Sequence, residues 1–399
     1  MTDGALAGLR VVELSRFAAA PYCGKFLVGC GAEVIKVEPP DGDPIRHLGP
    51  FKDDLPNRET GATFLFLNTG KKSVTLDAGT PSGRPILLDL IAKADVLLTD
   101  WEPALLEQHG LTYEALEKIN PRLVFTAISF FGQTGPYRDY AATELIGQAM
   151  GGYLSITGQP DGPPVKVCGN VGQYQGGLQG AVGTMAAILE QDLTGVGQLV
   201  DVSITESLAF ESTSVTRWLN SGSVMPRGGN RLARSNVNGL YPATVLPCKE
   251  GWVHVHEGHG RSEMLALLME EPRIMDPEIQ SEPYGHADLL DQLCLPWLSQ
   301  HDKFEAVTRA QELRLPFAEV LDIPEVLLDE QHAARDYIVE LDHPVAGVTG
   351  QPGFVFQSSE TPWQTSRAPL LGEHCAELYG ELLGFTADEL RALRERKVI

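Results

Sequence analysis

The chain has no long apolar stretch and comparatively few basic residues. No apolar run approaches the ~18 residues of a membrane-spanning helix, and the N-terminal Met1-Thr2-Asp3-Gly4 shows no basic patch followed by an apolar segment. We therefore expect no signal peptide, no membrane partner and a cytoplasmic location. Lys and Arg number 31 against 53 Asp and Glu, a net charge of -22. This argues against nucleic acid as a partner, because phosphates require a basic surface.

Several motifs of known chemistry are also absent. The six cysteines include no C-x-x-C pair, so we expect free thiols rather than disulfides or a zinc site. No G-x-G-x-x-G follows the first expected strand, and no G-x-S-x-G occurs. The segment His256-Glu257-Gly258-His259 is one residue too short for a metalloprotease helix. These absences predict neither a dinucleotide cofactor nor a bound metal.

The first half of the chain alternates regularly between strand and helix patterns. The chain has 399 residues, more than one hydrophobic core usually supports, so two domains are expected. Short β-rich runs and intervening helical patterns predict a parallel α/β sheet. The expected strands are residues 9–14, 33–37, 73–76, 95–99 and 123–128, and the expected helices are 21–30, 85–92 and 175–189.

A change of composition after Ser221 predicts a domain boundary. The next segment is basic and loop-like, and strand patterns follow at residues 241–246 and 252–256. Helical patterns then continue to about residue 313. We predict a large domain at residues 1–224 and a smaller α+β domain at residues 225–325.

Five segments, in order along nearly the whole chain, carry a family resemblance. They are residues 9–46, 68–77, 94–98 with Asn120-Pro121, 129–136 and 368–374. Together they resemble the class III CoA-transferases, the family of formyl-CoA transferase and carnitine CoA-transferase. The resemblance implies a Rossmann-like large domain to which residues 326–399 return, and an interlaced dimer. It also implies coenzyme A as a substrate, with an aspartate that forms a mixed anhydride and then a CoA thioester.

The family's aspartate position holds an amide in this chain. In the run Gly172-Gln173-Tyr174-Gln175-Gly176-Gly177, the glycine spacing places Gln173 on the aspartate position. A carboxylate can attack a thioester, whereas the delocalised lone pair of a primary amide cannot form the mixed anhydride. No acid is close in sequence, since Asp161 lies twelve positions upstream. No catalytic residue is therefore assigned with certainty.

Other positions also differ from the family pattern. By the resemblance, a family glutamine falls on Ala18, a CoA-phosphate arginine on Gln108, and the glycine-rich loop on residues 234–239. Asp100 and Glu102 stand where CoA phosphates are expected to approach, and like charges repel. Three basic residues remain where the family places cations, and we predict that they bind CoA: Lys71, Lys72 and Arg46.

These features favour one subunit of a heteromeric CoA-transferase. A homologous partner would carry the aspartate, as in the paired benzylsuccinate enzyme of aromatic degradation, and CoA would move between an acyl-CoA, such as succinyl-CoA, and a carboxylic acid. The alternatives are a homodimeric acyl-CoA lyase, racemase or decarboxylase, or a non-catalytic acyl-CoA-binding homologue. A racemase needs a proton-transfer pair, but its expected histidine falls on Thr143 and its aspartate on Gln173.

Overall fold

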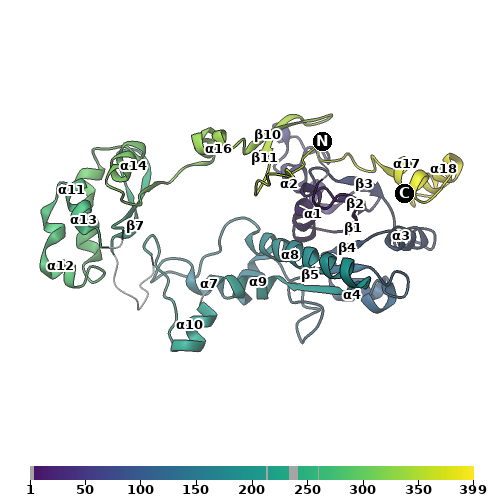
Figure 1. Ribbon diagram of the computed structural model, residues 1–399, viewed down its shortest axis with the longest axis horizontal. Helices are drawn as coiled ribbons and strands as arrows, with labels where there is room; N and C mark the ends of the chain where they lie inside the picture. Colours follow the sequence, from purple (N-terminus) through teal and green to yellow (C-terminus); the bar gives the residue numbers. More distant parts are fainter. Residues whose placement is uncertain (1–3, 213, 233–240, 259) are drawn as a thin grey trace. The chain divides into compact units, whose positions relative to one another are not determined.

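The computed structural model describes residues 4–212, 214–232, 241–258 and 260–399 (Figure 1). The chain forms two compact units. Unit 1 contains Met1–Gly151, Cys168–Glu211 and Glu330–Ile399, and unit 2 contains Gly152–Val167 and Ser212–Asp329. The candidate site described below lies wholly within unit 1.

Unit 1 is built on a six-stranded parallel sheet, which confirms the predicted α/β class. Its strands follow the order β3-β2-β1-β4-β5-β6. The strand sequences are rich in Val, Ile and Leu, and most of their residues are buried, because helices cover both faces of the sheet. The strands are β1 (Arg10–Leu14), β2 (Glu33–Glu38), β3 (Lys72–Thr75), β4 (Val96–Thr99), β5 (Val124–Ser129) and β6 (Leu199–Ser203).

Two helices, α1 (Ala19–Gly29) and α8 (Val171–Thr194), pack closely together beside the sheet (Figure 1). Their approach depends on a missing side chain at Gly177, where a Cβ atom would lie 2.6 Å from the carbonyl oxygen of Ala19. The helix α8 begins four residues before the predicted start at residue 175. This earlier start puts Gln173 inside the first turn of the helix.

The opposite layer joins distant parts of the sequence. The helices α3 (Gly83–Ala92), α17 (Cys375–Glu377) and α18 (Ala387–Glu395) share one hydrophobic core with the sheet. The Tyr379 hydroxyl donates to the carbonyl oxygen of Thr75 at 2.9 Å. The C-terminal segment therefore completes the same core that the N-terminal strands begin. The other elements of unit 1 are α2 (Ala62–Leu67), α4 (Pro103–Gln108), α5 (Tyr113–Leu116), α6 (Glu144–Met150), α9 (Ile204–Glu211), α16 (Glu330–Ala334), β10 (Ile338–His343) and β11 (Gly347–Pro352).

The strand order reverses between β1 and β4. The chain leaves β1 toward one edge of the sheet and, after β3, crosses back to continue from β4 to the other edge. In open parallel sheets such a switch point opens a crevice beyond the carboxyl ends of the strands, where ligands usually bind. A ligand site is therefore expected at the loops that follow β1 and β4.

Unit 2 has its own core, with Val253, Leu290 and Trp297 among its buried side chains. Its three-stranded sheet has the order β7-β8-β9, and the helices between Ser262 and Glu312 pack around that core. No described helix in either unit is long and apolar enough to cross a membrane. The elements of unit 2 are α7 (Tyr153–Ile156), α10 (Ser214–Ser221), β7 (Ala243–Pro247), β8 (Trp252–His256), α11 (Ser262–Leu268), α12 (Pro277–Ser281), α13 (Ala287–Leu298), α14 (Lys303–Glu312), β9 (Ala318–Glu319) and α15 (Ile323–Leu328).

Candidate functional site

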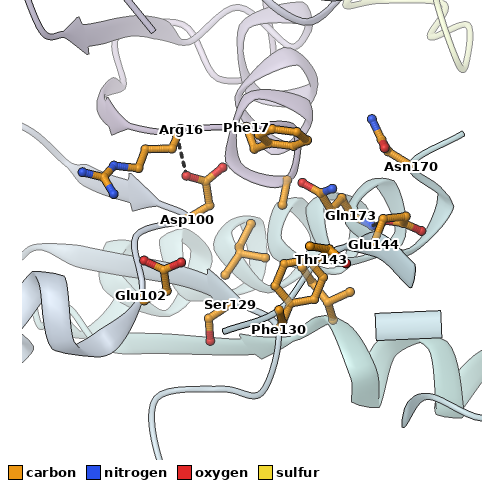
Figure 2. Close-up of a pocket in the computed structure, with 14 residues that line it drawn as sticks. Arg16, Phe17, Asp100, Glu102, Ser129, Phe130, Thr143, Glu144, Asn170 and Gln173 are labelled. Carbon is orange, nitrogen blue, oxygen red and sulfur yellow. Dashed lines mark hydrogen bonds between the residues drawn. The ribbon is translucent and has the colours of Figure 1, made fainter. Parts of the chain in front are cut away.

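A cavity of about 370 Å³ opens at the switch point of the parallel sheet. Its walls come from the loops after β1 and β4, the end of β5, the start of α6 and the first turn of α8 (Figure 2). Its volume is in the range of small-molecule sites. The lining residues are Arg16, Phe17, Ala19, Asp100, Glu102, Ile128, Ser129, Phe130, Ala142, Thr143, Glu144, Asn170, Gln173 and Ile204.

Gln173 lies in this cavity, in the first turn of α8, and only 4% of its surface is exposed. Its side-chain amide faces the cavity (Figure 2). Its backbone N–H donates to Glu144 Oε2 at 3.2 Å, and the N–H of Gly172 donates to Glu144 Oε1 at 2.8 Å. Glu144 thus binds the positive end of α8, which a carboxylate stabilises. Gln148 Nε2 donates to the same carboxylate at 2.8 Å.

Glu144 is the residue that the sequence argument missed. Glu144 is 29 positions away from Gln173 in the sequence, and the start of α6 brings it to the first turn of α8. Glu144 is the first residue of α6 and binds the first turn of α8, and the sequence spacing does not indicate this contact. The cavity therefore contains carboxylic groups, but Glu144 is already engaged by three hydrogen bonds.

Asp100 performs a similar task for α1. Its carboxylate accepts hydrogen bonds from the backbone N–H groups of Arg16, at 2.8 Å, and Ala20, at 3.3 Å. It therefore occupies the helix N-terminus that in many α/β proteins receives a phosphate. Burial raises the pKa of the Asp100 carboxyl to about 7, and the two backbone hydrogen bonds oppose that rise. Asp100, which the sequence placed where CoA phosphates are expected to approach, thus binds the start of α1.

We expect Asp100→Asn to change how stability depends on pH. Asp has a pKa near 4 in unfolded chains, so the raised pKa in the folded state makes ionisation unfavourable for folding as the pH rises from about 4 to about 7. Asn keeps an oxygen for α1 and removes this cost. The stability of the variant relative to the parent should therefore increase by about 2–3 kcal/mol between pH 5 and pH 8. Urea unfolding at both pH values measures this gain, and equal differences at both would contradict it.

The polar groups of the cavity lie at two ends. Figure 2 shows Asp100, Glu102 and Ser129 on one side of the Phe17 and Phe130 rings. Gln173, Glu144 and Asn170 lie on the other side. Apolar side chains separate the two ends, so a bound molecule would place an apolar body between two polar groups.

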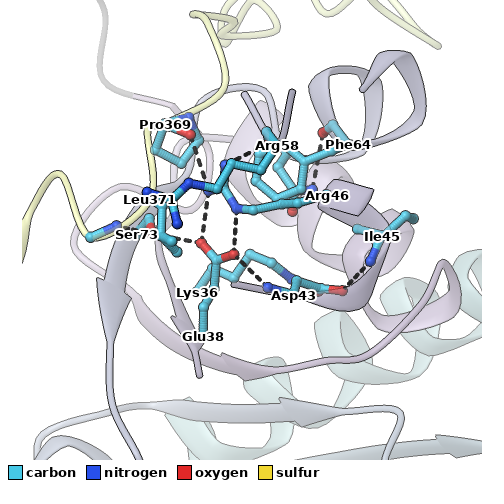
Figure 3. Close-up of polar contacts among 12 residues, drawn as sticks. Lys36, Glu38, Asp43, Ile45, Arg46, Arg58, Phe64, Ser73, Pro369 and Leu371 are labelled. Carbon is cyan, nitrogen blue, oxygen red and sulfur yellow. Dashed lines mark hydrogen bonds and ion pairs between the residues drawn. The ribbon is translucent and has the colours of Figure 1, made fainter. Parts of the chain in front are cut away.

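Arg46, one of the three cations predicted to bind CoA, is fully buried in an ion-pair cluster (Figure 3). Its guanidinium donates to both oxygens of Glu38, at 2.6 and 2.9 Å, and to Glu59 Oε2 at 2.9 Å. It also donates to the carbonyl oxygen of Pro369 at 3.2 Å and lies 3.6 Å from the Phe64 ring centroid. These contacts give Arg46 a structural role, and its contact with CoA stays a prediction.

The two lysines differ in exposure. Lys71 is buried, and its ammonium donates to Glu13 Oε2 at 2.7 Å, to the carbonyl oxygen of Pro21 at 2.9 Å and to Asn68 Oδ1 at 3.0 Å. Lys72 is partly exposed, with its ammonium 2.8 Å from Glu33 and 2.6 Å from Glu377. Neither residue lines the cavity that contains Gln173. Their contacts with CoA also stay predictions.

The remaining positions that differ from the family pattern fall in different places. Ala18 is fully buried, Glu102 and Thr143 line the cavity, and Gln108 is the last residue of α4. The expected loop at residues 234–239 lies outside the described residues.

A second cavity, of about 360 Å³, adjoins the first along the edge of the sheet, and Arg16 lines both. Its lining includes Asp41 and Asp77, and Arg16 is the single Lys or Arg among the described lining residues. Figure 2 shows the Arg16 side chain directed away from Gln173. The carboxyl ends of β1 to β4 thus present few cations to a phosphate-bearing ligand.

Comparisons with known proteins match these observations. The family model for CoA-transferase family III matches residues 6–375. The succinyl-CoA–D-citramalate CoA-transferase of Chloroflexus aurantiacus is 34% identical, over 99% of this chain and 98% of that protein. The succinyl-CoA–L-malate CoA-transferase beta subunit of the same organism is 32% identical, over 99% and 98%.

A solved structure shows the same fold. The crystal structure of a CaiB/BaiF family protein from Brucella suis has a TM-score of 0.84 and 28% identity, and the match covers 95% of this chain and 100% of that one. The family model spans most of the chain, and the curated relatives match it over nearly their full lengths. This chain belongs to CoA-transferase family III.

Proposed function

We propose that this chain is the non-nucleophilic subunit of a CoA-transferase, and that a homologous subunit supplies the aspartate. The enzyme would move CoA from an acyl-CoA, such as succinyl-CoA, to a carboxylic acid. The observation that carries this proposal is Gln173, which lies buried in the cavity at the start of α8 and presents an amide to it. A relative named as a beta subunit supports the existence of paired subunits in this family.

The chemistry assigns a nucleophile to the partner. Its aspartate carboxylate would attack the thioester carbonyl, the C–S bond would break, and CoA thiolate would leave a mixed anhydride. The thiolate would then attack the aspartyl carbonyl, which releases the first acid and leaves an aspartyl-CoA thioester. The carboxylate of the second acid would attack this thioester and expel the CoA thiolate. The thiolate would attack the acyl carbonyl of the new mixed anhydride, which forms the product acyl-CoA and frees the aspartate. In this chain, Glu144 and Asp100 hold the N-termini of α8 and α1, so they shape the cavity rather than react.

The cavity contains two carboxylates besides that of Glu144, and the test has to show that neither of them reacts with the acyl-CoA. Asp100 and Glu102 lie at the end of the cavity away from Gln173, and Asp100 is bonded to α1. The racemase alternative is not favoured, because the described lining residues include Thr143 and no histidine. The lyase and decarboxylase alternatives are tested by the same comparison, in which activity is measured with and without a second chain.

Co-expression with an aspartate-bearing family member is expected to yield a one-to-one complex. Native mass spectrometry gives the stoichiometry, and transfer from succinyl-CoA to a panel of acids gives the activity. We expect transfer only when both chains are present, and its loss when the partner's aspartate is changed to asparagine. Transfer by this chain alone would overturn the proposal and direct attention to the exposed carboxylate of Glu102, and then to Asp100 and Glu144.

A further inference from the structure

Gln173 carries a buried amide that is open to the cavity and has no partner among the described residues. Only 4% of the residue is exposed, and it lines the cavity from the first turn of α8. No described residue forms a hydrogen bond with its side-chain amide, whereas its backbone N–H donates to Glu144. The amide atoms keep accessible surface on the side of the cavity (Figure 2). A buried amide without a partner is unfavourable unless a ligand or water satisfies it.

A second glutamine on the same helix gives an internal comparison. Gln191 also belongs to α8, and 1% of its surface is exposed. Its side-chain nitrogen, however, donates to the carbonyl oxygen of Arg122, and it does not line the cavity. One buried glutamine of α8 is therefore satisfied within the protein, while the other presents its amide to the cavity.

A ligand carboxylate at the Gln173 amide would lie close to another carboxylate. Glu144 accepts hydrogen bonds from the backbone N–H groups of Gly172 and Gln173, at 2.8 and 3.2 Å. It already compensates the positive end of α8, so a second negative charge there would meet the repulsion of Glu144. A carboxylate also only accepts hydrogen bonds, whereas an amide both donates and accepts them. An uncharged carbonyl group therefore fits this end of the cavity better than a carboxylate does.

The other end of the cavity offers no better place for a carboxylate. Asp100 and Glu102 lie there (Figure 2). Arg16 is the single Lys or Arg among the described lining residues, and its guanidinium carbon lies 5.6 Å from the Trp101 ring centroid. An anionic ligand would thus meet acidic side chains in either orientation.

We propose that this cavity binds the acyl part of uncharged acyl derivatives, namely thioesters and carboxamides, much more tightly than the corresponding free carboxylates. The Gln173 side-chain nitrogen donates to the ligand carbonyl oxygen, and Phe17 and Phe130 contact the apolar body of the ligand. A carboxamide can in addition donate to the Gln173 side-chain oxygen. The identification of the natural ligand as an acyl thioester rests on the proposed function, whereas the preference for an uncharged carbonyl rests on the cavity. The non-nucleophilic subunit would then hold an acyl group while it is a thioester and release it as the acid.

Three compounds with the same apolar body test this preference. They are 3-phenylpropanamide, the S-ethyl thioester of 3-phenylpropanoic acid, and 3-phenylpropanoate. Isothermal titration calorimetry on the full chain, alone and in complex with its partner, measures their affinities at neutral pH. The carboxylate should bind at least about 10-fold more weakly than the amide, because it meets a like charge in either orientation. The thioester should bind within about 10-fold of the amide, since it lacks only the amide's donor.

Two glutamine variants assign the carbonyl contact to one side chain. Gln173→Leu keeps the approximate size of the side chain and removes its amide, so it should weaken binding of 3-phenylpropanamide by about 3- to 10-fold, the loss of one hydrogen bond. Gln191→Leu is the matched control on the same helix. It should lower Tm, because it leaves the carbonyl oxygen of Arg122 without its partner, and keep the affinity for the amide.

A third variant tests the charge independently of Gln173. Glu144→Gln keeps an oxygen for the first turn of α8 and removes the negative charge, so it should narrow the gap between the amide and the carboxylate. The inference is overturned if the carboxylate binds as tightly as the amide or if none of the three compounds binds. It is also overturned if Gln173→Leu keeps the parent affinity for the amide, or if folded Glu144→Gln leaves the gap unchanged.

The outcomes separate this inference from the proposed function. Transfer of CoA by the two-chain complex, with no binding of these compounds to this chain, would remove the inference and leave the proposed function standing. Binding in the expected order, without transfer by any complex, would leave the ligand preference and remove the function.

Discussion

Gln173→Asp is expected to be acylated by an acyl-CoA, whereas the parent chain is expected to form no covalent adduct. Asp is one methylene shorter than Gln, so it fits the same buried position in the first turn of α8. Its carboxylate can attack a thioester, which the amide cannot. The backbone N–H of this residue should keep its bond to Glu144, because that bond does not involve the side chain.

Intact-mass measurement after incubation with succinyl-CoA should show near-stoichiometric adducts on the variant. The mixed anhydride adds a succinyl group, the aspartyl thioester adds CoA, and hydroxylamine should remove both. Gln173→Asn is the matched control, since it has the shape of Asp without the nucleophile, and it should stay unmodified. An adduct on the parent chain would contradict the expectation, and peptide mapping would show whether Asp100 or Glu144 carries it.

Arg46→Met should destabilise the protein by about 3–5 kcal/mol, the cost of removing one partner from a buried ion pair. Glu38 would then remain buried without the two guanidinium bonds that it now accepts. The cluster also holds two other segments (Figure 3). Ser73 Oγ donates to Glu38 Oε1 at 2.6 Å, and Arg46 donates to the carbonyl oxygen of Pro369 in the C-terminal return segment. The loss is therefore expected to loosen the packing of the C-terminal segment as well.

A second arginine offers the control for that experiment. Arg367 pairs with Glu373 at 2.9 Å through Nη1, and both side chains are partly exposed. Exposed pairs contribute little, so Arg367→Met should cost about 1 kcal/mol or less. Urea unfolding of both variants measures the difference. Equal losses would show that the buried cluster around Arg46 is not a special source of stability.

The sequence predicted the sheet well because its signals are local. The runs Val11-Val12 and Val34-Ile35 mark strands that are covered on both faces, and their period is visible without any tertiary information. The glycine spacing also placed Gln173 near the start of a helix. The start itself was predicted four residues too late, because Gly172, Gly176 and Gly177 weaken the helical pattern of the first turns. The acid that binds this helix end comes from another helix.

The electrostatics of the site could not be predicted in the same way. Asp100 and Glu102 looked alike as acids beside a strand end, yet Asp100 accepts backbone hydrogen bonds from Arg16, in the loop before α1, and from Ala20 in its first turn. Lys71 was predicted to bind CoA, and in the structure Glu13 pairs with it in the interior. Each outcome depends on which distant element folds against the residue, and a single sequence does not contain that information.

The carboxylate of Asp100 has a further consequence for ligand competition. It is a ligand tethered to the helix N-terminus that it binds, so its effective concentration there is in the millimolar range or above. A phosphate group that binds this end of α1 therefore has to displace the Asp100 side chain first.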